Sequence, residues 1–428
     1  MKPIITEIAP GVRCCAIAAE RFKTSRFVLQ IALPLRLEQD KQTAAGALLP
    51  FLLHRSCAAH PTPRALESKL ADLYGAHLSA NVQKLGEVQL LSIALTAIDD
   101  RFALGGEKIA EGCADLLLDL LFAPLLENGA FPKQSIALEQ RLLIERLESE
   151  EGDKWQHAQN RAEALMCSQE AYGLNPLGER EAIAALTPED ITQAWRSTLE
   201  TAPMQLIMVS TAGCEGVCAA LKARFIKQAR NPIMPQTEFI AQAGESKSVR
   251  EEQPVEQANL VIGLRAGVQE AAEKQYALRV MDDIFGGGVY SKLFVNVREK
   301  MSLCYRVRSY FYRYKGVIMV RAGIDTEKFE EARDAIFEML RQMRAGEFTD
   351  EDLATSQRAL CDHFTTVEDL PESLANWYST SLVSGQFITP EAACARVKAV
   401  TREEVIEAAN GVTLDTVYLL AAKKEGSE

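Results

Sequence analysis

The feature that most constrains the fold of this chain is a weak internal duplication. A buried-strand pattern followed by a polar stretch and a long apolar helix begins at Ser25 and again at Gln257. Later in each half, ALTPEDITQAW at 185–195 matches AVTREEVIEAA at 399–409, and each match leads into an apolar strand. In both matches an acidic residue follows a threonine by three positions, which is the pattern of a capped helix start. The sequence therefore predicts two equivalent halves.

A polar segment separates the two halves. Residues 227–258 contain three prolines and show no sustained helical period, which is typical of a linker with one short strand. We therefore predict an N-terminal domain over 1–226, a linker over 227–256 and a C-terminal domain over 257–428. A chain of 428 residues is long enough for two such domains.

Strands alternate with helices within each half. Alternating or continuous apolar patterns predict strands over 87–98 and 317–324. Helical periodicity is predicted over 100–122, 132–166, 328–344 and 349–366. This order indicates an α+β fold of two homologous domains, each an antiparallel sheet covered by helices.

Charge and hydropathy argue against two classes of partner. A net charge of −12 does not suit a nucleic-acid-binding surface, which needs clustered Lys and Arg. The chain has no run of about 18 apolar residues, and its first residues have no apolar core of a signal peptide. We therefore expect a cytoplasmic protein that binds neither nucleic acid nor membrane. The ten cysteines, mostly in apolar segments, are expected to be reduced and buried.

The segment that points most directly to chemistry is IFGGGVYSKLFVNVREKMSLCYRV at 284–307. It is predicted to contain the end of an apolar helix and then a turn at Gly286, Gly287 and Gly288, because glycine permits a tight reversal. A second helix is expected over 291–300, followed by a strand from Cys304.

Arg298 and Tyr305 are the candidate substrate-binding residues of this segment. Guanidinium and phenol groups are the kinds of donor that bind a peptide carbonyl in a dry cleft. The alternative interpretation is a surface ion pair between Arg298 and Glu299, together with a core tyrosine whose hydroxyl is satisfied.

The same segment resembles the C-terminal half of the insulinase/pitrilysin family of zinc metallopeptidases. In that family a Gly-rich turn, a Ser-x-Leu-Phe helix and an Arg-Glu-Lys-x-x-Leu-x-Tyr run occur together. The resemblance covers nearly the whole chain and implies two homologous α+β domains in each subunit. It also implies that Arg298 and Tyr305 help to bind and orient the substrate backbone.

The zinc motif of that family, His-x-x-Glu-His, is missing from its expected place. The motif positions fall on Ala47, Pro50 and Phe51, whose side chains have no atom that binds zinc. The third ligand belongs to an E-x-x-x-x-x-x-E pattern that would start at Glu139, but the residue seven positions on is Arg146. We therefore predict no catalytic residue, no metal site and no cofactor in this chain, with zinc expected on a partner subunit.

Other patterns offer no clear replacement site. The five histidines, which could only form a metal site if the fold brought them together, are His54, His60, His77, His157 and His363. Cys214 and Cys218 have the wrong spacing for a zinc ribbon. The three glycines are not followed by the Gly-Lys-Ser/Thr of a phosphate loop.

The resemblance implies a non-catalytic subunit that pairs with a zinc-bearing relative as a heterodimer and binds a peptide substrate. Segments 60–102 and 138–166 are similar to a non-catalytic branch that is named in Firmicutes for the 5-aminopentanol modification of elongation factor P. That branch implies a role in peptide processing or in the modification of that factor. Two alternatives stay open: a structural scaffold like the core subunits of the respiratory bc1 complex, and an active metallopeptidase with atypical ligands.

Overall fold

The computed structural model describes residues 2–226, 228–267 and 274–423, so residues 268–273 of the predicted repeat that begins at Gln257 lie outside the described residues. The described chain forms two compact units, and each takes segments from both halves of the sequence. The first unit contains Met1–Leu147, Asn175–Gln236 and Thr366–Pro390. The second unit contains Glu148–Leu174, Thr237–Thr365 and Glu391–Glu428.

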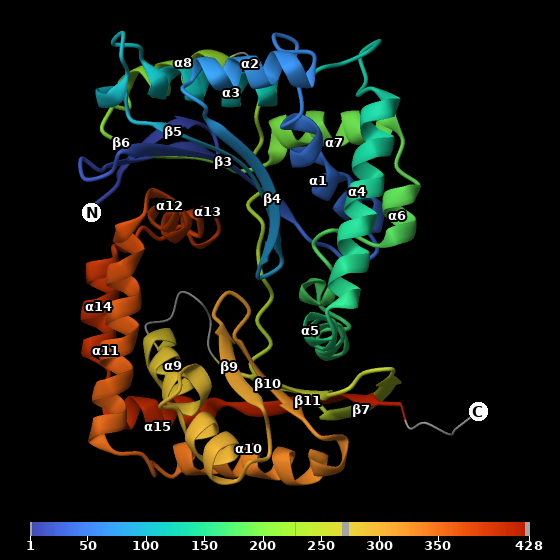
Figure 1. The fold of residues 1–428 in the computed structure, drawn as a ribbon, viewed down its shortest axis with the longest axis vertical. Helices are drawn as coiled ribbons and strands as arrows, with labels where there is room; N and C mark the ends of the chain where they lie inside the picture. The colour runs from blue at the N-terminus through green and yellow to red at the C-terminus, as the bar shows by residue number, and fades with distance from the viewer. Residues whose placement is uncertain (1, 227, 268–273, 424–428) are drawn as a thin grey trace. The chain divides into compact units, whose positions relative to one another are not determined.

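The first unit is built on a six-stranded sheet with the order β1-β2-β6-β3-β5-β4 (Figure 1). Its neighbouring strands are antiparallel except for β2 and β6, which are parallel. The strands are β1 (Ile4–Ala9), β2 (Val12–Ala18), β3 (Thr24–Pro34), β4 (His77–Leu85), β5 (Val88–Ile98) and β6 (Met204–Ser210).

The second unit repeats this topology without the first strand. Its sheet has the order β7-β11-β8-β10-β9, in which only β7 and β11 are parallel. The predicted duplication is therefore confirmed, while both sheets are mixed rather than purely antiparallel. The strands are β7 (Lys247–Gln253), β8 (Ala258–Arg265), β9 (Arg306–Tyr312), β10 (Val317–Ile324) and β11 (Thr413–Ala422).

Helices cover both faces of the first sheet. Figure 1 shows α2, α3 and α8 on one face and α12 on the other, where Leu374, Ala375 and Tyr378 of α12 pack against Ile17 and Val209. The α-helices of this unit are α1 (Asp40–Leu53), α2 (Pro63–Asp72), α3 (Ile109–Phe122), α4 (Lys133–Gly152), α6 (Arg180–Ala184), α7 (Pro188–Thr201), α8 (Glu215–Phe225), α12 (Pro371–Ser379) and α13 (Ser381–Ser384). Two short 3-10 turns are η1 (Asp100–Phe102) and η6 (Val367–Asp369).

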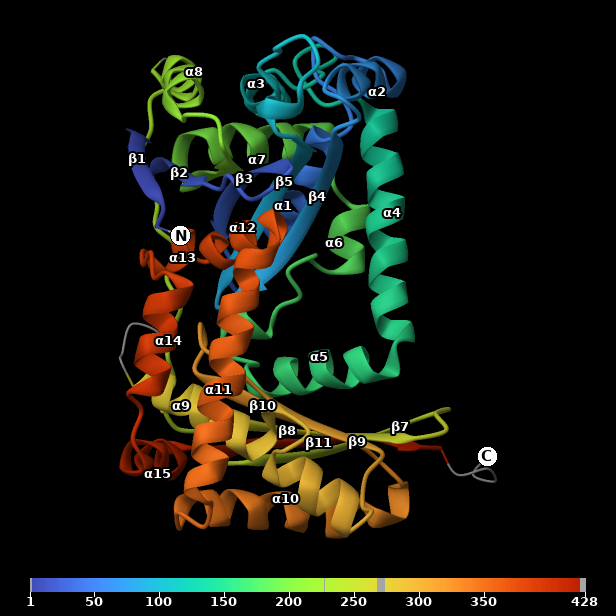
Figure 2. The same ribbon diagram turned by 60° about the vertical axis from the view of Figure 1, so that its left-hand side comes forward.

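The second sheet is covered in the same way. Figure 2 shows α5 on one face and α10 on the other, and Ala158, Ala162 and Met166 of α5 pack against Val261 and Met319 of the sheet. The α-helices are α5 (Lys154–Met166), α9 (Gln275–Asp282), α10 (Phe329–Arg344), α11 (Asp350–Thr366), α14 (Pro390–Lys398) and α15 (Arg402–Gly411). The other helical turns are η2 (Ala171–Gly173), η3 (Asp283–Gly287), η4 (Leu293–Lys300) and η5 (Thr326–Lys328).

Equivalent capping boxes begin α7 and α15, as the duplication predicts. The Thr187 hydroxyl accepts a hydrogen bond from the backbone N–H of Asp190 at 3.3 Å. The Thr401 hydroxyl accepts from the backbone N–H of Glu404, also at 3.3 Å. In both boxes the acidic side chain bonds back to the threonine N–H, so two donors at each helix start are satisfied.

Two predicted helices begin or break differently from the expectation. The helix predicted over 132–166 is divided into α4 and α5, because the Asp153 carboxylate caps a new helix by accepting from the N–H groups of Trp155 and Gln156. The helix predicted over 100–122 starts only at Ile109, after the short turn η1.

One cysteine pair differs from the expected reduced state. Cys361 of α11 and Cys394 of α14 form a disulfide in the second unit, whereas the other eight cysteines are thiols. Of these eight, all but Cys214 are buried, as predicted. No helix in the described part of the chain is both long enough and apolar enough to cross a bilayer.

Candidate functional site

The glycine-rich segment packs closely against β9. Gly286 and Gly287 lie in a wide helical turn of the π type rather than in a tight reversal, and the chain becomes extended at Gly288. A Cβ atom on Gly286 would lie 2.5 Å from Oγ and 2.8 Å from the backbone nitrogen of Ser309. The predicted turn is therefore wrong for Gly286 and Gly287. Glycine is required at position 286 because the backbone there packs closely against Ser309.

Arg298 and Tyr305 line one concavity of about 470 Å³ in the second unit. Arg298 lies in the last turn of η4, and Tyr305 lies just before β9, where its N–H donates to the carbonyl of Gly323 at 2.9 Å. The residues that line this concavity are Arg298, Glu299, Ser302, Leu303, Cys304, Tyr305, Asp325 and Lys328. The structure thus brings the two predicted site residues to one surface.

Tyr305 is a surface residue with a charged partner. Its side chain is 61% exposed, and its hydroxyl donates to Oδ1 of Asp325 at 2.8 Å. Lys328 lies 3.2 Å from the same carboxylate. The hydrogen bond to Asp325 raises the pKa of Tyr305, and the same bond lowers the pKa of Asp325. The phenol therefore stays protonated at neutral pH and remains a donor.

Arg298 is held by two contacts on its own helix. Its guanidinium lies over the Phe294 ring at 4.4 Å from the centroid, and its Nε is 3.6 Å from Glu299. The alternative interpretation is thus correct about an Arg298–Glu299 ion pair, but Tyr305 is exposed rather than in the core. Exposed ion pairs of this kind are weak, so the guanidinium can exchange Glu299 for a ligand at small cost.

Cys304 borders the concavity but is not activated. Burial raises the pKa of its thiol to about 11, and the nearby charge of Arg298 opposes this rise only in part. A thiol is nucleophilic as the thiolate. Cys304 is therefore a protonated side chain in the wall of the concavity at neutral pH.

Asp325 and Lys328 are site residues that the sequence interpretation missed. Both follow β10, and the antiparallel pairing of β9 with β10 carries Asp325 to the Tyr305 hydroxyl. The available signal was an acidic residue directly after a buried strand. The signal could not be used because the register between 306–312 and 317–324 was not known from the sequence.

The positions of the missing zinc motif are filled by packing. Ala47, Pro50 and Phe51 lie within α1 and are all buried. Arg146 of α4 places its guanidinium 4.5 Å from the centroid of the Phe51 ring. Phe51 occupies a position where the family has a zinc ligand, and Arg146 occupies the position of the third ligand. A cation–π contact worth about 0.5–2 kcal/mol therefore joins these two residues.

The polar side chains near Phe51 and Arg146 already have hydrogen-bond partners within the protein. Glu139 is buried and its carboxylate accepts from Arg55 at 2.5 Å. The Nδ1–H of His54 donates to the Phe51 carbonyl at 2.6 Å, and burial lowers the pKa of His54. The available donors do not fit a zinc ion, and in the described residues no group of three His, Cys, Asp or Glu side chains is placed to hold a metal.

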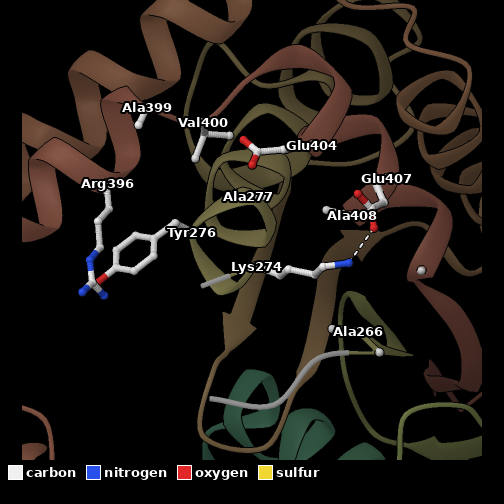
Figure 3. A pocket seen from close by; sticks show the side chains of 12 residues that line it. Ala266, Lys274, Tyr276, Ala277, Arg396, Ala399, Val400, Glu404, Glu407 and Ala408 are labelled. Carbon is white, nitrogen blue, oxygen red and sulfur yellow. Dashed lines mark hydrogen bonds and ion pairs between the residues drawn. The ribbon is translucent and has the colours of Figure 1, made fainter. Parts of the chain in front are cut away.

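A second cavity of the second unit, about 540 Å³ in volume, is lined by α9, α14, α15 and the residues after β8 (Figure 3). Lys274 and Glu407 form an ion pair at 2.6 Å, and Arg396 lies over the Tyr276 ring at 5.4 Å. Two of its charged groups thus contact each other, and a third contacts an aromatic ring. Among the described residues that line it there is no histidine, cysteine or serine, so these residues form no Ser–His or Cys–His pair.

Comparisons with known proteins agree with the observed fold and with the side-chain packing at the expected metal-ligand positions. A family model described as the "Peptidase M16 inactive domain" matches residues 185–360. The "Probable inactive metalloprotease YmfF" of Bacillus subtilis is 30% identical over 417 residues, which cover 97% of each chain.

Solved structures share the whole fold. A conserved protein from Enterococcus faecalis V583 has a TM-score of 0.89 at 23% identity, and the match covers 100% of both chains. A structure described as a peptidase M16 inactive domain from Pseudomonas fluorescens has a TM-score of 0.81 at 16% identity, again over 100% of both chains. The α+β class with two sheets packed by helices is therefore confirmed, and the chain belongs to the M16 peptidase family and is of its inactive-domain type.

Proposed function

We propose that this chain is a non-catalytic, cytoplasmic M16 subunit that pairs with a zinc-bearing relative and helps to bind and orient a peptide. The observation that carries the proposal is a contrast between two sites in one chain. Arg298 and Tyr305 share an open concavity in which their donor groups have only exposed carboxylates, Glu299 and Asp325, as acceptors. By contrast, the expected metal-ligand positions have no zinc-binding atom, and the Phe51 ring at one of them packs against Arg146. The name of the Bacillus subtilis relative supports the non-catalytic assignment.

The chemistry available at the concavity suits an extended peptide backbone. Arg298 presents several N–H donors and Tyr305 one O–H donor, and peptide carbonyls are acceptors. Asp325 and Lys328 add one charge of each sign beside the phenol. These groups bind and orient a peptide, and none of them supplies a hydrolytic step.

The first test is co-expression of this chain with the zinc-motif relative encoded in the same genome. We expect a one-to-one complex that carries zinc on the relative and cleaves peptides only when both chains are present. Mass, zinc content and peptide cleavage are measured for each preparation. Stoichiometric zinc and cleavage by this chain alone would instead establish an active metallopeptidase with atypical ligands.

The second test concerns the two site residues. Arg298→Ala and Tyr305→Phe are each expected to lower kcat/KM of the complex for peptide cleavage by about tenfold, the value of one hydrogen bond, with assembly unchanged. Arg341→Ala and Tyr74→Phe serve as matched controls, because Arg341 is an exposed, ion-paired arginine and Tyr74 donates to the exposed Glu107 carboxylate. Equal activity in all four variants would favour a structural scaffold.

We also propose, from the resemblance to the non-catalytic branch named above, that the processed peptide belongs to the modification of elongation factor P. Deletion of the gene is expected to leave that factor without its 5-aminopentanol group. Intact-mass analysis of the factor purified from the deletion strain tests this, and an unchanged mass would remove the pathway assignment while leaving the peptide-binding role.

A further inference from the structure

One face of the second sheet concentrates arginines at its edge. Arg306 and Arg308 lie two residues apart on the edge strand β9, and both are exposed. Arg321 on β10 is paired directly opposite Arg308. Residues two apart on a strand share a face of the sheet, and so do directly paired residues on neighbouring strands. Three guanidinium groups therefore share one face, which we call the arginine face.

The arginine face lacks neutralising partners. In the part of the chain that the structure describes, none of its three guanidinium groups forms an ion pair. Asp153 acts on Arg306 and Arg321 only as a nearby charge, and its carboxylate is used by the N-terminal N–H groups of α5. Asp283 likewise interacts with Arg308 as a nearby charge, and its carboxylate accepts from the Tyr290 hydroxyl. Positive charge of this density without an ion-paired carboxylate is suited to an anionic ligand.

Neighbouring groups hold the three side chains in place. The Arg306 and Arg321 guanidinium groups lie over the Trp155 ring, 3.5 and 4.3 Å from its centroid. Arg308 donates to the Gly287 carbonyl at 2.9 Å and to the Tyr310 hydroxyl at 3.3 Å. These contacts use aromatic rings and neutral acceptors, so they orient the guanidinium groups without cancelling their charge.

Arg321 has a buried hydrogen-bond donor without an acceptor, which independently indicates an absent ligand. The residue is only 6% exposed, and its terminal nitrogens donate to the Gln159 side chain and to the Trp155 carbonyl. Its Nε is buried and has no hydrogen-bond partner. An unpaired buried donor is costly, and such a group in a native protein calls for an explanation, of which an absent ligand is one.

We infer that the arginine face binds acidic side chains of an extended peptide. Alternate side chains of an extended chain repeat at roughly 6.8 Å, which matches the spacing of Arg306 and Arg308 along β9. Carboxylates are planar acceptors that fit the guanidinium fork. The exposed Tyr310 ring offers apolar surface to the aliphatic parts of the peptide side chains. A polynucleotide is a poorer fit, because the chain carries a net charge of −12.

This inference rests on the peptide-binding role proposed above and deepens it by naming the class of peptide. β9 begins at the residue after Tyr305, so the two sites are neighbours along the chain. They are nevertheless built from different side chains, and each can be removed without the other.

The test uses the intact chain and fluorescein-labelled peptides of alternating Glu and Ser, with matched peptides of alternating Gln and Ser. Fluorescence anisotropy is expected to show binding of the Glu peptide that is about tenfold or more tighter than binding of the Gln peptide. Added salt should weaken the binding of the Glu peptide, because the contacts are ionic and partly exposed. This comparison needs no variant and is unaffected by folding defects.

The double variant Arg306→Gln/Arg308→Gln should remove the preference for Glu. Its matched control is Arg333→Gln/Arg341→Gln on α10, which removes the same charge from two ion-paired arginines, the half-buried Arg333 and the exposed Arg341. The control should bind the Glu peptide as the unaltered chain does. Circular dichroism and thermal melting of both variants show whether they are folded.

The outcomes separate this inference from the proposed function. Equal affinity for Glu and Gln peptides, or equal loss in the control variant, overturns the acidic preference and leaves the proposed function intact. If the Glu peptide binds more tightly than the Gln peptide and its affinity is unchanged in Arg298→Ala and Tyr305→Phe, the arginine face is upheld and the role of that pair is overturned. Tighter binding of a single-stranded DNA oligonucleotide with the same variant dependence would overturn the assignment to a peptide, and no binding of any probe would overturn both.

Discussion

Asp282 is a buried carboxylate in the last turn of α9, beside the glycine-rich segment. Burial raises its pKa to about 7, the neighbouring charge of Asp283 adds to the rise, and Ser309 opposes it. Oδ1 of Asp282 has no hydrogen-bond partner. Because the folded pKa is above the unfolded value, the folded state binds the proton more tightly, so stability is lost as pH rises from about 4 to 7.

Asp282→Asn is therefore expected to raise the melting temperature at pH 8 and to change it little at pH 4. The neutral amide avoids a charge whose burial costs about 1.4 kcal/mol for each unit of raised pKa. Thermal melts at the two pH values measure the effect, with the exposed Asp334→Asn on α10 as the control. A variant that is destabilised equally at both pH values would show that the pKa of Asp282 is not raised in the folded state.

At the scale of elements, a buried ionic cluster joins the segment after α5 to the second sheet. Glu170 accepts from Arg265 of β8 at 2.6 Å and from Lys315, in the turn before β10, at 2.7 Å. Arg265 also donates to Asp415 of β11 at 2.8 Å. All four side chains are at most 7% exposed. Burial alone would raise the pKa of Glu170, but the hydrogen bonds from Arg265 and Lys315 outweigh it and lower the pKa.

Glu170→Gln should lower the free energy of unfolding by about 3–5 kcal/mol, because the buried Lys315 ammonium loses its carboxylate and Arg265 keeps only that of Asp415. Urea unfolding followed by circular dichroism measures the loss. The control is Glu338→Gln, which breaks an exposed ion pair with Arg341 and should change the stability little, because solvent screens such pairs. Similar losses of unfolding free energy in both variants would mean that the cluster is hydrated rather than buried.

At the scale of the whole molecule, the two sheets depend on helices from opposite halves of the sequence. Segment 148–174, which contains α5, belongs to the second unit, and segment 366–390, which contains α12, belongs to the first. Each of these helices buries apolar side chains against its sheet. The burial of apolar area is the main stabilising term in folding, so neither half of the sequence contains a complete core.

Fragments 1–236 and 237–428 are therefore expected to be unstable when each is produced alone and to form one folded species when they are co-expressed. The first fragment would expose Ile17, Val28 and Val209, which α12 covers in the intact chain. Binding of a hydrophobic dye and the sharpness of thermal unfolding measure the difference. Cooperative unfolding of the isolated first fragment without dye binding would contradict this interdependence.

The sequence by itself determined the repeated architecture and the loss of the zinc ligands. Thr187 and Thr401 predicted two equivalent helix starts, because a capping box is a local arrangement of four residues. The absence of donors at Ala47, Pro50 and Phe51 is likewise a matter of residue type, which no folding can alter. Arg298 and Tyr305 were found from a motif, and the structure places them on one surface.

Only the tertiary structure decided which residues complete each site. The approach of Asp325 to Tyr305, the alignment of Arg321 with Arg308 and the stack of Arg146 on Phe51 join residues on different elements. Strand register and helix packing set these contacts, and both depend on the whole core rather than on local pattern. The exchange of α5 and α12 between the sheets is of the same kind, because an apolar helix face shows that it must be buried but not against which sheet.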